Sequence, residues 1–118
     1  MATIEELMQA NLGAVFSERD ASRRRAAIAR TYAPDVVFSD PEGTVTGHEA
    51  LDAKAQAVLE QSPDFVLAPA SEINVVNDLG YLAWNLGPEG QPPVVRGVDI
   101  ALVKNGVIAR LYTLLLPA

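Results

Sequence analysis

The chain has 118 residues, of which 49% are hydrophobic and 20% are charged, so it is long enough for one domain (residues 1–118) with one sizeable core. Its 15 acidic and 9 basic residues give a formal net charge of -6, which argues against a nucleic-acid partner because the phosphate backbone requires a basic surface. Without cysteine and with a single histidine, the sequence excludes disulfides, thiolate catalysis, zinc–sulfur sites and histidine-rich metal sites.

The first predicted helix begins at the N-terminus. Thr3 and Glu6 have the spacing of a capping box, and apolar residues then recur at helical spacing as far as Arg19. This acidic, helix-forming start lacks the charged and then apolar pattern of an export signal, and no apolar run reaches the roughly 20 residues of a membrane span. We therefore expect a cytoplasmic protein that does not enter a membrane.

A second, shorter helix is predicted to run to Tyr32, and Pro34 ends it. Asp20 or Ser22 can serve as its N-cap. The run Arg23–Arg25 is the basic cluster of the chain, and its position predicts a solvated first turn of this helix rather than a nucleic-acid site.

The middle of the chain predicts two short strands and a third helix. Residues 36–39 and 44–46 are strand-like and flank an Asp-Pro turn. The sequence "TGHE" of residues 46–49 has capping-box spacing, and the helix that it opens is broken at Pro63. His48 lies in the first turn of this helix, where an exposed surface position is expected rather than general-base chemistry.

The second half of the chain predicts strands separated by turn residues. The Asn105-Gly106 pair between two apolar runs is the strongest hairpin signal. Helices followed by an antiparallel meander are typical of an α+β domain whose helices pack on one face of a sheet. The expected strands cover residues 65–70, 71–77, 80–87, 93–104 and 107–116.

Asp99 is the most informative residue of these strands. Because side chains alternate along a strand, it shares a mostly apolar face with its small neighbours Gly97 and Ala101, which leave a hollow around the carboxyl group. Desolvation there would raise its pKa and keep it neutral, so that it donates a hydrogen bond. The alternative is an ion pair with Arg110 on the next strand, since Arg96 lies on the opposite face.

The opposite face of the same strand is also apolar. Its row of side chains is too hydrophobic for open solvent, which predicts a homodimer through this outer sheet face. The row consists of Val94, Val98, Ile100 and Leu102.

Two long stretches of the sequence carry a family resemblance. "YAPDVVFSDPEGTVTG", followed by a helix, and "VVRGVDIALVKNGVIARLYTLLLP" resemble the nuclear-transport-factor-2-like superfamily, and within it the ketosteroid-isomerase-like and SnoaL-like (polyketide cyclase) group. The likeness covers nearly the whole chain, although the individual motifs are short. It implies a cone in which three N-terminal helices close over a strongly curved, mostly antiparallel sheet and enclose a ligand cavity, and such domains are usually homodimers.

The resemblance also assigns roles to residues. In ketosteroid isomerases an aspartate at the place of Asp40 is the general base, and one at the place of Asp99 is a protonated hydrogen-bond donor to the substrate oxygen. SnoaL-type cyclases also use an acid at the Asp99 position. Tyr32 matches a tyrosine of the isomerase network, whereas Phe16 and Ala55 stand where the isomerases have tyrosines. The absence of the principal donor tyrosine, which Phe16 replaces, argues against efficient steroid isomerisation.

The predicted function is acid–base proton transfer on a hydrophobic carbonyl compound, as an isomerisation or a cyclisation, with Asp40 and Asp99 as catalytic residues. No metal or organic cofactor is implied. The rival hypothesis, favoured by Phe16 and Ala55, is a non-catalytic small-molecule-binding or dimeric accessory domain. The residues expected to contact the small hydrophobic ligand are Phe16, Tyr32, Leu82, Trp84, Gly97, Ala101, Leu111 and Thr113.

Overall fold

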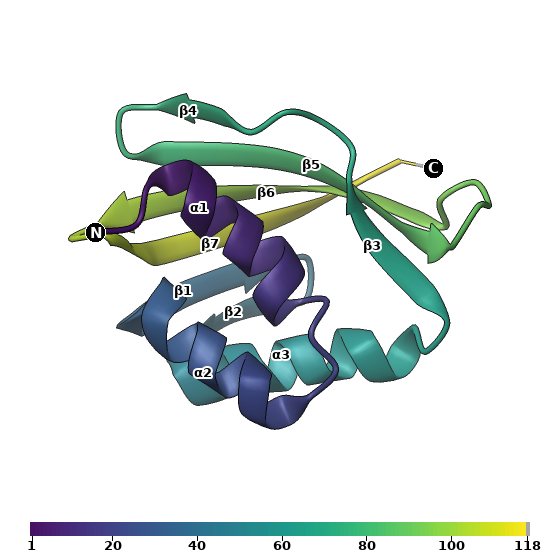
Figure 1. Ribbon diagram of the computed structural model, residues 1–118, viewed down its shortest axis with the longest axis horizontal. Coiled ribbons are helices and arrows are strands. Elements are labelled where there is room, and N and C mark those ends of the chain that lie inside the picture. Colours follow the sequence, from purple (N-terminus) through teal and green to yellow (C-terminus); the bar gives the residue numbers. More distant parts are fainter. Residues whose placement is uncertain (118) are drawn as a thin grey trace.

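A strongly curved, mostly antiparallel sheet with helices on one face makes up the computed structural model, which describes residues 1–117 (Figure 1). The predicted α+β class is confirmed. The helices are α1 (Ile4–Ala10), the π-helical turn η1 (Asn11–Val15), α2 (Ala21–Thr31) and α3 (His48–Gln61). The strands are β1 (Tyr32–Asp40), β2 (Gly43–Thr46), β3 (Phe65–Pro69), β4 (Asn74–Val76), β5 (Leu79–Pro88), β6 (Val95–Lys104) and β7 (Val107–Leu116).

The sheet joins strands that are far apart in the sequence. Its order is β2-β1-β7-β6-β5-β3, and β4 also pairs with β5. β1 runs parallel to β7, and the other neighbouring strands are antiparallel. The parallel pairing places the C-terminal end of β1 beside β7, and the candidate site lies there.

The first helix is not a single α-helix. Its capping box is confirmed, since the Thr3 and Glu6 side chains each accept the other's backbone amide. However, the prediction of one helix as far as Arg19 is wrong, because α1 changes to the π-helical turn η1 after Ala10. Such turns are rare and are often found at functional sites. Here the turn carries Asn11, which is fully buried.

Three other predictions about helical residues are wrong. Arg24 is fully buried rather than solvated, because α2 packs on α3 and its guanidinium reaches Asp52 there. The third helix is capped by Gly47 without a side-chain hydrogen bond, so the expected capping box does not form. His48 is half-buried rather than exposed, and its Nε2 lies 2.9 Å from the carbonyl oxygen of Tyr32.

The hydrophobic core lies between the helices and the inner face of the sheet. Its most buried members are Met8, Val15, Ile28, Tyr32, Val36, Leu51, Ala55, Ile108 and Leu111. Five polar residues are buried with them, namely Asn11, Arg24, Thr31, Ser62 and Asp99. Within residues 1–117, every buried side-chain nitrogen or oxygen has a hydrogen-bond partner.

The outer face of the sheet is partly apolar and open. Val94 is 57% exposed and Leu114 is 48% exposed, whereas Val98 is buried and Ile100 and Leu102 are half-buried. A homodimer through this face stays a prediction. In the described residues, the helices are too short or too polar to cross a membrane.

Candidate functional site

Three side chains on neighbouring strands line up across the inner face of the sheet. Asp99 on β6 pairs with Thr113 on β7, and β7 runs beside β1 in a register that pairs Tyr112 with Ser39. One residue further along this register, Asp40 lies beside Thr113. The two aspartates are therefore two strands apart, roughly 10 Å between their Cα atoms, with Thr113 between them.

Asp99 is 5% exposed, and its carboxyl group accepts three hydrogen bonds. Asn11 Nδ2 donates to Oδ2 at 2.7 Å, while Trp84 Nε1 and Thr113 Oγ1 donate to Oδ1 at 3.0 and 2.8 Å. A carboxylate has about four acceptor positions, so one position on Oδ2 is left for a proton or a ligand. The alternative of an ion pair with Arg110 is wrong, because Arg110 is an exposed residue of the outer face.

Local backbone geometry explains how two of these donors reach Asp99. The π-helical turn carries Asn11 to the core, where its Oδ1 accepts a short hydrogen bond from the Tyr32 hydroxyl, so its amide hydrogens point to Asp99. Gly97 pairs with Trp84 across the sheet, and a Cβ at Gly97 would lie 2.2 Å from the indole ring. The hollow predicted beside Asp99 is thus filled by the indole of Trp84.

The surroundings of Asp99 change its ionisation. Burial raises the pKa of the Asp99 carboxyl above its ordinary value, although the hydrogen bonds from Thr113, Trp84 and Asn11 act in the opposite direction. Burial, together with the charge of Asp99, also raises the pKa of Tyr32 well above its ordinary value. The phenol therefore stays protonated and keeps donating to Asn11.

Asp40, at the end of β1, belongs both to a turn and to the site. Its Oδ1 accepts the Glu42 amide at 2.9 Å, which starts the turn into β2. Its Oδ2 lies 3.2 Å from the ammonium group of Lys54 on α3, and Glu42 lies 3.1 Å from the same group. Although desolvation acts against it, the hydrogen bonds to Glu42 and Asp40 raise the pKa of Lys54. Lys54 therefore stays charged and supplies a counter-charge at the site.

Asp40 and Asp99 line one cavity of about 330 Å³, a volume near the lower end of the range for small-molecule sites. Its apolar walls include Phe16, Phe38, Val58, Leu67, Trp84 and Leu86. Its polar residues are Asp40, Glu42, Gln61, Ser62, Asp99 and Thr113. A mostly apolar cavity with a few converging polar groups is typical of sites that bind small organic molecules.

The structure brings some of the predicted ligand-binding residues to this cavity and places the others behind its wall. Phe16, Trp84 and Thr113 line the cavity together with both aspartates. The remaining five are buried beside the site but are not lining residues: Tyr32, Leu82, Gly97, Ala101 and Leu111. Ligand contact by any of the eight stays a prediction.

Sequence reasoning missed Asn11 and Lys54. A signal for Asn11 was present, because it lies four and three positions after Leu7 and Met8 on the buried face of the first helix. No comparable signal marked Lys54, since its approach to Asp40 depends on how α3 packs. For metals, residues 1–117 contain no group of three or more histidine, aspartate or glutamate side chains that could hold an ion.

The curved sheet, the helices on its inner face and the apolar cavity with a buried carboxyl group define a cavity-bearing α+β domain. The chain belongs to the SnoaL-like domain family, whose model matches residues 12–111. The resemblance seen in the sequence is thereby confirmed. No curated protein matches the chain.

Solved structures share the fold at low sequence identity. A protein from Agrobacterium tumefaciens, provisionally named an isomerase of the SnoaL-like family, is 21% identical with a TM-score of 0.86, over 94% of this chain and 95% of that chain. A protein from Sinorhizobium meliloti, provisionally named a polyketide cyclase, is 23% identical with a TM-score of 0.72, over 91% and 92% of the chains. One from Kribbella flavida, provisionally named a ketosteroid isomerase, is 17% identical with a TM-score of 0.73, over 97% and 78%.

Proposed function

We propose that this protein moves a proton on a small, neutral, hydrophobic carbonyl compound held in the cavity. The observation that carries the proposal is the buried carboxyl group of Asp99, which has one free position on Oδ2 and lines the same apolar cavity as Asp40. Paired carboxyl groups with different surroundings are a common basis for acid–base catalysis. The provisional names of the solved relatives are compatible with this chemistry.

In the proposed reaction, Asp40 accepts a proton from the carbon next to the carbonyl group, and the electron pair of the C–H bond moves toward the carbonyl oxygen to form an enolate. Asp99, in its neutral form, donates a hydrogen bond from Oδ2 to that oxygen. Where the ketone carries a β,γ double bond, return of the proton from Asp40 to the γ-carbon completes an isomerisation. Attack of the enolate carbon on a second carbonyl group of the same molecule, with transfer of the proton from Asp40 to the oxygen of that group, completes a cyclisation.

The lining of the cavity favours an uncharged substrate. Asp40 and Glu42 both pair with the ammonium of Lys54, so this cation is already balanced where it borders the site. An anionic substrate would meet a second carboxyl group at Asp99, and its desolvation would not be offset. Phe16 lacks the hydroxyl of a phenol donor, and the absence of one such donor costs about 2.7–4 kcal/mol of transition-state stabilisation.

A non-catalytic binding domain is the second candidate function. It is favoured by Phe16, by Ala55, which is fully buried and offers no polar group, and by the ion pair that occupies Asp40. In that case the cavity holds a ligand without exchanging its protons.

Deuterium exchange at the carbon next to the carbonyl group of β-tetralone, followed by NMR in D2O, separates the two functions. We expect exchange faster than in buffer. Because the neutral form of Asp99 is the active one, the rate should fall as the pH rises through the raised pKa of Asp99. Binding of the ketone, seen as a change in Trp84 fluorescence, without faster exchange would contradict catalysis and favour the binding domain.

A further inference from the structure

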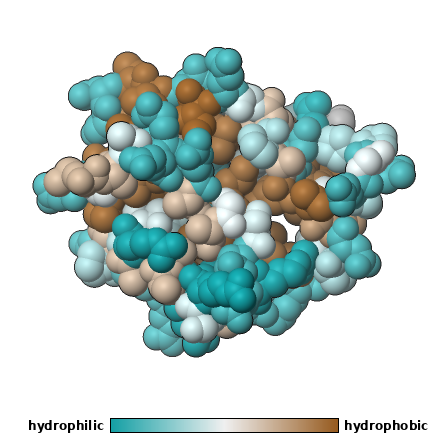
Figure 2. Space-filling model, viewed as in Figure 1, coloured by the Kyte–Doolittle hydropathy of each residue, from teal (hydrophilic) through white to brown (hydrophobic). Residues whose placement is uncertain are grey.

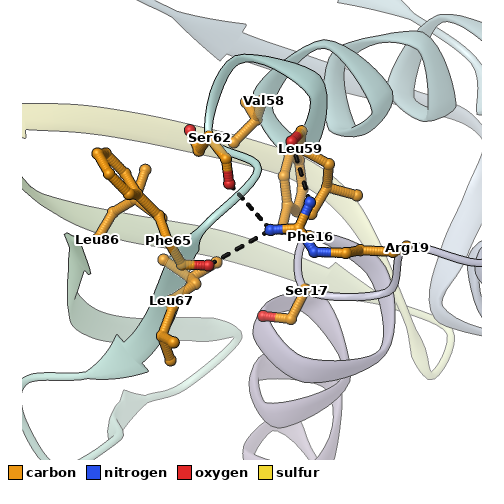
Figure 3. A pocket seen from close by; sticks show the side chains of 10 residues that line it. Phe16, Ser17, Arg19, Val58, Leu59, Ser62, Phe65, Leu67 and Leu86 are labelled. Atoms are coloured by element: carbon orange, nitrogen blue, oxygen red, sulfur yellow. Dashed lines mark hydrogen bonds between the residues drawn. The ribbon is translucent and has the colours of Figure 1, made fainter. Parts of the chain in front are cut away.

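A second chamber, called the outer chamber, adjoins the cavity that contains Asp99, called the inner chamber. It has a volume of about 210 Å³ and lies where the end of η1, the C-terminal end of α3 and β3 meet (Figure 3). The two chambers share five lining residues, namely Phe16, Val58, Ser62, Leu67 and Leu86. In the view of Figure 1, the surface is hollowed to the right of its centre, with hydrophobic side chains above the opening and hydrophilic ones below it (Figure 2). The chambers are therefore neighbours with a common wall rather than unrelated surface pockets.

Phe16 is an aromatic side chain of that wall. It lines both chambers, and its ring packs against Phe38 of the inner chamber at a centroid distance of 5.9 Å. Phe16 is half-buried and follows directly after the π-helical turn. A change of its rotamer would therefore alter the wall between the two chambers without unfolding a helix.

The guanidinium of Arg19 lies among the lining residues of the second chamber (Figure 3). It donates to the carbonyl oxygens of Leu59 at 3.1 Å, Ser62 at 2.9 Å and Phe65 at 3.4 Å, as the dashed lines in Figure 3 show. These bonds hold the end of α3 against the start of β3. They also occupy the terminal guanidinium nitrogens, so the chamber presents mainly apolar side chains such as Phe65 to a ligand.

We propose that the second chamber is a subsite for an apolar tail, and that Phe16 is the residue that sets how long a substrate the protein accepts. The inference rests on the proposed function, which places the carbonyl group of the substrate at Asp99. The tail would then pass Phe16 and lie against apolar lining residues of the second chamber such as Val58 and Phe65. The substrate class is a neutral ketone with an extended alkyl or aryl tail, rather than a compact ring that fills the inner chamber alone.

Methyl n-alkyl ketones of increasing length test the subsite, with binding measured by the fluorescence of Trp84, the sole tryptophan of the chain. In the wild-type protein, affinity should rise by about fourfold for each added methylene after the inner chamber is full. Phe65→Asp places a charge in the outer chamber only, so it should stop this rise at the long ketones and leave the short ones unchanged. Phe16→Ala should increase the ratio of long-chain to short-chain affinity.

The inference would be overturned if the ratio of long-chain to short-chain affinity were the same in the wild type, Phe65→Asp and Phe16→Ala. The absence of binding at every chain length would also overturn it. Phe16→Trp is the matched opposite variant and should lower the ratio; because it adds a second tryptophan, its binding is measured by isothermal titration calorimetry. Failure of the proposed function has a different signature, because short ketones would then bind without deuterium exchange while the dependence on chain length persisted.

Discussion

Replacing Asp99 with leucine should lower the rate of β-tetralone deuterium exchange by about 10²–10³-fold, the usual effect of removing one hydrogen-bond donor to a developing oxyanion. Asp99→Asn should lower the exchange rate less, because an amide keeps an N–H donor at nearly the same place. The exchange rate of Asp99→Asn should not fall with rising pH as the wild-type rate does, since an amide does not titrate. Exchange rates of the three proteins over a range of pH check this prediction.

Two outcomes would contradict the donor role of Asp99. If the asparagine variant is as slow as the leucine variant, the group acts as an ionised base instead. If leucine is as fast as aspartate, the residue has no part in the chemistry. Asp40→Asn is the complementary variant and should cost about 10²–10⁴-fold, because it removes the general base. Circular dichroism of each variant shows whether a slow protein is also a folded one.

Replacing Asp52 with alanine should reduce the free energy of unfolding by about 3–5 kcal/mol, because it leaves the buried guanidinium of Arg24 without its counter-charge. The Arg24 side chain is 1% exposed and its Nε lies 2.6 Å from Asp52 Oδ1. Although partial burial acts against it, the hydrogen bonds from Arg24 and Arg25 hold the pKa of Asp52 below its ordinary value. Urea denaturation measures the change.

Arg23→Ala is the matched control for this pair. Arg23 belongs to the same basic run, but its side chain is 77% exposed and lies 3.9 Å from Asp20. Its loss should cost no more than about 0.5 kcal/mol. An equally small cost for Asp52→Ala would mean that water replaces the carboxylate at Arg24, and the buried ion pair would then not stabilise the contact between α2 and α3.

Much of the fold was predictable because periodicity and turn residues act locally. The capping box at Thr3 and the turn at Asn105-Gly106 both form, and the predicted strands pair in one sheet, although the strand expected over residues 71–77 covers only Asn74–Val76. The pairing of strands that are far apart in the chain was harder to predict from the sequence. The parallel contact of β1 with β7 joins segments separated by most of the chain, so no local pattern specified it without the family resemblance.

The burial of Arg24 shows where sequence reasoning failed although a signal was present. Arg24 lies three, four and seven positions before Ala27, Ile28 and Thr31, and these residues share the buried face of α2. Reading the run of arginines as one solvated cluster ignored this helical period. The depth of burial, however, also required a carboxylate at Asp52 on another helix, which spacing alone does not show.

The candidate site was predictable in part for a similar reason. Alternation along β6 placed Asp99 on the inner face, and that position is confirmed. The donors around it come from η1, β5 and β7, so the sequence did not show that Asn11, Trp84 and Thr113 converge on one carboxyl group. Gly97 leaves space beside its backbone, as expected, but the indole of Trp84 fills that space.

The most direct test of the proposed acid–base site is an NMR titration of the Asp99 side-chain carboxyl carbon, assigned by comparison with Asp99→Asn. We expect a midpoint clearly above the ordinary aspartate value of about 3.9, because burial disfavours the charged form more than the three hydrogen bonds favour it. A midpoint at or below the ordinary value would contradict the account. Asp99 would then be an ionised structural group, and the cavity would have no neutral acid to donate to a substrate oxygen.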